Sequence, residues 1–306
     1  MNRPQTAGPA LASGCPRWKA TNDGDHGADA GVNLGVAGVI VVAAVSAAVT
    51  VMFLIQRRAP VGGYFADSNR AAGVFGVLGT SFAVMLAFVI FLGFDSYGNA
   101  RDKAGQEAVS VTELFDTAAL FAAPARDDLR GQLICYARSV IHDEWPAMQK
   151  ERGSPVTQGW VDGLSAGIEH LDIAGEKQAA AYEHWFAIDA ARQEARRGRI
   201  AEASPFVPSP LWIILAIGAL VSIGYVWLFA DSRERFIVQA AMIGSVTVIV
   251  VASLLVVNFL DRPYENGSGS IVPVEMTRSL RIMEEYQGGP GPVGPPCSPL
   301  GLPTSR

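Results

Sequence analysis

Small and hydroxyl-bearing side chains recur along one apolar stretch of the chain. Gly73, Gly76 and Gly79 stand three residues apart, and Thr80 and Ser81 follow them directly. In a helix, small residues at this spacing let a second helix approach closely. The same spacing leaves room for a permeating ion, which hydroxyl groups can contact in a pore that has no charged rings. We therefore expect this stripe either to pack against another helix of the same subunit or to face a neighbouring subunit or a pore.

A second group of chemically capable residues stands where apolar segments end. Asp95 follows one such segment, and the sequence Asp261-Arg262-Pro263 closes another. Pro263 cannot continue a helix, and Arg262 is long enough to reach lipid headgroups or a carboxylate. We expect Asp95, Asp261 and Arg262 to form an ion pair at the membrane edge, and a pore mouth that attracts anions is the alternative.

The remaining reactive side chains match no catalytic or metal-binding pattern. His142, Asp143 and Glu144 are adjacent, but adjacent positions on a helix do not face one another. The sequence has no H-E-x-x-H motif, no Cys/His metal spacing, no G-x-S-x-G motif and no P-loop. A net charge of −5 gives no reason to expect a nucleic-acid surface. We therefore predict a protein that is not an enzyme, with no cofactor, no metal site and no nucleic-acid partner.

The three cysteines lie far apart in the sequence. Cys15 is in the N-terminal tail, Cys135 in a polar segment and Cys297 in the C-terminal tail. This distribution predicts neither a disulfide framework nor a metal site. Cys135 is expected to be a buried helix residue, because free cysteine behaves as a small hydrophobic side chain.

The elements that must position these residues are four uncharged apolar segments. They are Val32–Ile55, Gly73–Phe94, Leu211–Ala230 and Phe236–Leu260. A helix needs roughly 20 residues to cross a hydrocarbon core about 30 Å thick. Half of all residues are hydrophobic and only 17% are charged. The sequence therefore predicts an all-α integral membrane protein with four transmembrane helices in a lipid bilayer.

A helical extramembrane domain is expected between the second and third spans. The predicted units are a disordered tail (1–30), a transmembrane hairpin (31–94), the helical domain (95–210), a second hairpin (211–263), a short juxtamembrane helix (264–286) and a disordered Gly/Pro-rich tail (287–306). No proline separates Phe94 from Tyr97, so span 2 should continue into the domain as one long helix. Pro146 predicts a kink or a stop near Trp145. The basic run Arg192, Arg196, Arg197 and Arg199 is expected to face solvent or headgroups.

Four ordered motifs resemble the bacterial bestrophin-like membrane family, a domain of unknown function. They are the stretch Phe82–Ile90, Asp143-Glu144-Trp145-Pro146-Ala147-Met148, Pro210-Leu211-Trp212 and Leu260-Asp261-Arg262-Pro263. The resemblance covers roughly residues 65–285. Bestrophins are pentameric anion channels with four spans and a helical domain between spans 2 and 3. The resemblance thus implies a homo-oligomer, an inorganic anion and a bacterial plasma membrane location. No acidic cluster here matches the bestrophin calcium clasp.

Two questions stay open at this point. The short loops hold five arginines: Arg57, Arg58, Arg70, Arg233 and Arg235. The positive-inside rule then places these loops in the cytoplasm and the tails and domain outside, whereas the resemblance implies the reverse. The function is expected to be an oligomeric anion channel with span 2 lining the pore. The alternative is a non-conducting membrane scaffold or regulatory protein whose helical domain binds a partner.

Overall fold

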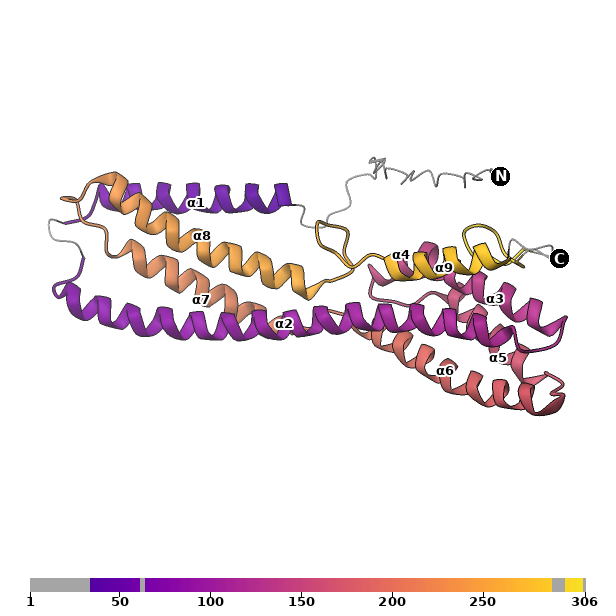
Figure 1. The fold of residues 1–306 in the computed structure, drawn as a ribbon. Coiled ribbons are helices and arrows are strands. Elements are labelled where there is room, and N and C mark those ends of the chain that lie inside the picture. Colours follow the sequence, from indigo (N-terminus) through magenta and orange to yellow (C-terminus); the bar gives the residue numbers. More distant parts are fainter. Residues whose placement is uncertain (1–33, 61–63, 288–294, 305–306) are drawn as a thin grey trace, which may run out of the picture.

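The computed structural model describes residues 34–60, 64–287 and 295–304. The helices are α1 (Leu34–Gln56), α2 (Ser68–Ala118), α3 (Ala125–Ser139), α4 (Trp145–Met148), α5 (Pro155–Glu169), α6 (Gly175–Ala201), α7 (Ser209–Trp227), α8 (Phe236–Asp261) and α9 (Val274–Gln287). A π-helical turn, Val140–Glu144, joins α3 to α4. Figure 1 shows two halves: α1, α7 and α8 lie beside the first part of α2, and α3, α5, α6 and α9 gather around its second part.

Helix α2 runs without interruption through both halves. Its 51 residues span about 76 Å at 1.5 Å per residue. Asp67 caps its start, where the carboxylate accepts a hydrogen bond from the Arg70 amide at 3.0 Å. The prediction that span 2 continues out of the membrane as one helix is confirmed, and the length of α2 fixes how the two halves are joined.

Helices α1, α2, α7 and α8 each contain a stretch long and apolar enough to cross a membrane. Only 11% to 28% of the residues in these apolar stretches are buried within the chain. Apolar surface of this extent is unfavourable in water, so it faces lipid. The described residues contain no β-strand, and their one β-bridge joins Cys297 to Pro303. The prediction of an all-α membrane protein with four spans is confirmed.

Tight contacts at glycines hold the spanning helices together. Gly218 of α7 lies directly against the ring of Phe82 on α2, with no room for a β-carbon. Gly93 of α2 is similar, because a β-carbon there would come within 2.8 Å of the Phe206 ring. Helix α1 packs along α8, and Trp227 donates a hydrogen bond to the Ala48 carbonyl at 3.2 Å.

The helical domain has its own hydrophobic core around Phe115, Leu133, Tyr136 and Trp185. Pro146 lacks an amide hydrogen and cannot donate the usual helical hydrogen bond. The helix does not end before it; the turn that precedes Trp145 widens to the π-helical form. The helix then continues to Met148. The distortion that Pro146 predicts near Trp145 takes the form of this π-helical turn, and Glu144 at its end is buried in the interior of the domain.

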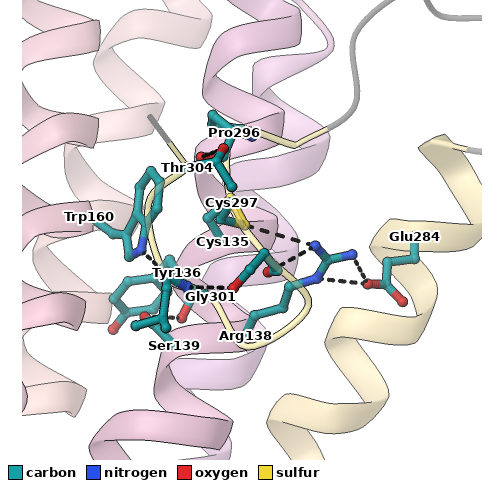
Figure 2. Close-up of a disulfide and its surroundings, with 12 residues drawn as sticks. Cys135, Tyr136, Arg138, Ser139, Trp160, Glu284, Pro296, Cys297, Gly301 and Thr304 are labelled. Carbon is teal, nitrogen blue, oxygen red and sulfur yellow. Dashed lines mark hydrogen bonds and ion pairs between the residues drawn. A yellow bond between two sulfur atoms is a disulfide. The ribbon is translucent and has the colours of Figure 1, made fainter. Parts of the chain in front are cut away.

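The C-terminal segment 295–304 lies against α3 and is not a free tail. Cys297 forms a disulfide with Cys135 of α3 (Figure 2). The expectation that the cysteines form no disulfide is therefore wrong, because α3 and the C-terminal segment meet although 162 residues separate the two cysteines. The expected disorder of 287–306 is likewise wrong for 295–304. The tail 1–30 and residues 288–294 lie outside the described residues.

Candidate functional site

The long helix α2 has one buried face and one exposed face along its whole length. The buried face contacts the other helices through Phe82, Leu86, Val89, Ala100, Glu107, Val111 and Leu114. These positions repeat at three- and four-residue steps, as one side of a helix requires. The opposite side carries Gly73, Gly76, Thr80, Ala83, Ala87, Phe91, Phe94, Asp95 and Asp102, all exposed. We call this opposite side the outer face of α2.

The sequence-predicted small residues lie on or beside the outer face. A β-carbon at Gly73, Gly76 or Gly79 would meet no atom of the structure within 4 Å. These glycines therefore pack against no helix within the described chain. Thr80 is exposed, and Ser81 donates its hydroxyl hydrogen to the Val77 carbonyl at 2.8 Å. Of the two expectations for this stripe, packing inside one subunit is not what the structure contains.

Aromatic rings and carboxylates follow the glycines along the same face. Phe91 and Phe94 are each 68% exposed. Asp95, Asn99 and Asp102 come next, and together with the phenylalanines they line a shallow hollow on the surface. Asn99 donates a hydrogen bond to the Asp95 carboxylate at 3.4 Å. The outer face thus changes from small to aromatic to acidic residues as α2 leaves the membrane.

The predicted ion pair at the membrane edge is not formed as expected. Asp261 is buried and accepts hydrogen bonds from the Val207 amide at 2.8 Å and the Trp212 indole at 3.3 Å. Arg262 pairs with Glu265 at 3.1 Å instead of with Asp95. Asp261 therefore ties the end of α8 to the entrance of α7, while Asp95 stays on the outer face of α2.

Behind the outer face, four buried charges join α2 to the rest of the helical domain. Arg199 of α6 contacts Glu107 of α2 at 2.5 Å and Glu144 of the π-helical turn at 2.6 Å. Arg196 contacts the other oxygen of Glu144 at 2.6 Å. Tyr136 of α3 donates its hydroxyl hydrogen to Glu107. We call Glu107, Glu144, Arg196 and Arg199 the buried tetrad; its formal charges sum to zero.

Glu144, Arg196 and Arg199 stay ionised although they are buried. Burial opposes the charged form of Glu144, but Arg199 and Arg196 outweigh this effect and hold the pKa of Glu144 below its ordinary value of 4.5. Burial also opposes the charge of Arg199, and Glu107 and Glu144 reverse this and raise its pKa. Burial and the neighbouring Glu107 raise the pKa of Tyr136, which keeps its hydroxyl protonated as a donor. Glu144, Arg196 and Arg199 thus keep their charges near neutral pH, and the tetrad joins α2 to α6 and to the π-helical turn.

The expectation that the basic run of α6 faces solvent or headgroups is wrong for three of its four arginines. Arg192, Arg196 and Arg199 are buried, and only Arg197 is exposed. The buried three stand at i, i+4 and i+7, which is one helix face, and that face also carries Trp185. This spacing is the signal in the sequence that identifies them. Arg192 pairs with Asp189 of the same helix at 2.6 Å. The partners of Arg196 and Arg199, Glu144 and Glu107, are too distant in the chain to be inferred.

The comparisons with known proteins agree with this architecture. The sequence matches the Bestrophin-like domain over residues 42–276. No curated protein matches the chain by sequence.

Solved structures share the fold at low sequence identity. A variant of a bacterial bestrophin homolog from Klebsiella pneumoniae superposes with a TM-score of 0.65 at 12% identity, over 81% of this chain and 99% of that one. A second crystal structure of this homolog gives a TM-score of 0.62 at 13% identity, over 81% of this chain and 98% of that one. A structure described as a membrane protein gives 0.64 at 14% identity, over 81% and 98%. The domain match spans most of the residues, and the chain belongs to the bestrophin-like family.

Proposed function

We propose that several copies of this protein surround a common axis and form an ion channel lined by the outer face of α2. The observation that carries the proposal is that this face packs against nothing in the described chain, although it bears glycines, a hydroxyl and carboxylates. Small residues within a membrane span are typical of contacts between helices. Carboxylates need water or a partner. A ring of copies would supply neighbouring helices for the small residues and a water-filled axis for the carboxylates.

The spanning helices α1, α2 and α8 all expose branched apolar side chains that suit contact with lipid tails. Val39 of α1 and Ile237 of α8 are at least 65% exposed, and so are Val77 and Val84 of α2. What sets α2 apart is that its exposed side continues into the carboxylates Asp95 and Asp102. This feature supports α2 as the helix that faces the axis. The bacterial plasma membrane is the location we propose.

The outer face suggests how such a pore would be divided. In a ring of copies, the phenylalanines Phe91 and Phe94 would form an apolar constriction, and hydrophobic constrictions gate pores by excluding water. Asp95 and Asp102 would then form acidic rings at the mouth. Acidic rings favour cations, whereas the family resemblance implies an inorganic anion. We propose that the mouth concentrates cations, and the anion is the alternative that the measurement below separates.

The first experiment measures ion flux across the membrane of liposomes that contain the purified protein. Gly76→Leu fills the open stripe on α2 and should change the flux severalfold if the stripe lines the pore. Gly35→Leu on α1 is the matched control, since Gly35 also has no atom within 4 Å of its β-carbon position. Folded protein that gives no flux above empty vesicles overturns the channel and favours the non-conducting scaffold.

The second experiment is the reversal potential across a bilayer with a salt gradient. Ideal selectivity for a monovalent ion gives about 59 mV per tenfold gradient. The reversal potential of the native protein should have the sign expected for a cation-selective channel. Replacing both carboxylates, by Asp95→Asn with Asp102→Asn, should shift the reversal potential toward the value expected for an anion-selective channel. Asp172→Asn, an exposed carboxylate in the helical domain, should leave it unchanged. A native reversal on the anion side refutes the cation mouth and leaves the channel standing.

A further inference from the structure

The disulfide joins Cys297 to Cys135 of α3 (Figure 2), and α3 lies in the half of the molecule away from the spanning helices α1, α7 and α8 (Figure 1). Cys135 is fully buried and Cys297 is 7% exposed. Disulfides form and persist in oxidising compartments and are rare in the cytoplasm, where thiols are kept reduced. The position of this bond therefore bears on which side of the membrane holds the domain.

The C-terminal segment 295–304 is shaped to fit the surface that it covers. Gly301 has a φ of +77°, and its α-carbon lies so close to the backbone of Ser139 that no side chain fits between them. Trp160 of α5 donates its indole hydrogen to the Gly301 carbonyl at 2.8 Å. Arg138 donates to the Ser298 carbonyl at 3.4 Å and pairs with Glu284 of α9 at 2.7 Å.

The segment also has an internal structure that presents Cys297. The Ser298 amide donates to the Leu302 carbonyl, and the Gly301 amide donates to the Ser298 carbonyl, both at 2.9 Å. Thr304 donates its hydroxyl hydrogen to the Pro296 carbonyl at 3.0 Å. The disulfide thus fastens a folded loop to α3, and Trp160 connects the same loop to α5.

A second observation concerns the opposite end of the molecule. The two short loops and the adjoining helix ends carry Arg57, Arg58, Arg70, Arg233 and Arg235. Short loops rich in arginine and lysine stay in the cytoplasm. In Figure 1 these loops lie at the end of the spans remote from the helical domain. The opposite side also carries arginines and lysines near the span ends, such as Arg101, Lys103 and Arg262, but at lower density along longer segments. The higher density of arginine in the short loops therefore favours the cytoplasm for these loops and the other side of the membrane for the domain, independently of the disulfide.

We infer that the helical domain and the C-terminal segment face an oxidising compartment outside the cytoplasm, where the Cys135–Cys297 disulfide fastens segment 295–304 over α3. Formation of the bond oxidises two thiols: two S–H bonds break and one S–S bond forms. Two electrons and two protons pass to the disulfide of a thiol–disulfide oxidoreductase, which leaves as a dithiol. This orientation is opposite to the one that the family resemblance implies, and it does not depend on whether the protein conducts.

The orientation is tested in spheroplasts of a bacterial host that produce the full chain with its three cysteines changed to serine. Single cysteines are then introduced as Ala187→Cys in the helical domain or Ser232→Cys in a short loop, both at exposed positions. A membrane-impermeant maleimide should label the first variant in intact spheroplasts and the second only after the membrane is opened. The reverse pattern overturns the inference.

The disulfide is tested on the native chain, which is trapped in acid, denatured and treated with a maleimide that carries a polyethylene glycol. One adduct, on Cys15, is expected before reduction and three after it, because the chain has three cysteines. Cys135→Ser is the control and should give two adducts with or without reduction. Three adducts on the native chain without reduction overturn the inference, whatever the labelling pattern.

Discussion

Replacing Glu144 by glutamine tests the role of the buried tetrad. The change removes one negative charge and leaves Arg196 and Arg199 facing an amide that is completely buried. Glu144 accepts hydrogen bonds from both arginines and from the Ser154 amide. The carboxylate is therefore the partner on which two buried cations depend.

The expected loss of stability follows from this geometry. Removing one partner of a buried ion pair costs about 3–5 kcal/mol, because a buried charge is left uncompensated. At roughly 2–4 °C per kcal/mol for a unit of this size, the melting temperature should fall by about 6–20 °C. Glu194→Gln is the matched control: Glu194 pairs with Lys103 at 3.4 Å but is 73% exposed. An exposed pair contributes only about 0–1 kcal/mol.

The assay is thermal unfolding of the purified protein in detergent, followed by intrinsic tryptophan fluorescence. Three of the six tryptophans, Trp145, Trp160 and Trp185, lie in the helical domain, so half of these fluorophores report on that part of the chain. Equal melting temperatures for Glu144→Gln and Glu194→Gln would refute the argument that the tetrad fixes α2 to the domain.

Three further predictions concern stability. The pKa of Glu144 is lowered in the folded state, so the stability that its carboxylate contributes is present above its unfolded pKa and is lost as the pH falls through its folded pKa. The melting temperature of the native protein should therefore fall as the pH is lowered below about 4.5, and that of Glu144→Gln should fall less. Cys297→Ala opens a loop closed across 162 residues, and should cost up to about 5 kcal/mol in a denaturant titration, a difference that a reductant should abolish. Gly218→Val should lower the melting temperature through its contact with Phe82, whereas Gly224→Val, with no atom within 4 Å, should not; equal effects would refute close packing at Gly218.

The spans and the long helix α2 can be predicted from the sequence because their signal is local. Uncharged apolar segments of about 20 residues mark the spanning helices, and the absence of proline between Phe94 and Tyr97 predicts that α2 continues. The stripe of Gly73, Gly76 and Gly79 is visible in the sequence, but which side of it is free depends on how α2 packs against α7 and α8. Only the folded chain supplies that information.

The buried charges and the disulfide could not be predicted because they depend on contacts between distant residues. The spacing of Arg192, Arg196 and Arg199 places them on one helix face, yet solvent is the usual environment for such residues. Arg192 pairs with Asp189 on its own helix, and Glu107 and Glu144 approach Arg196 and Arg199 from two other elements. Cys135 and Cys297 likewise gave no spacing signal, and the Gly/Pro-rich composition around Cys297 favoured disorder.

Single-particle imaging of the detergent-solubilised protein tests the central proposal most directly. We predict a symmetric ring with an axial opening, in which Gly76, Phe91 and Asp102 of every copy point toward the axis. A monomer, or a ring in which these residues of α2 face detergent on the outside, would contradict the proposal.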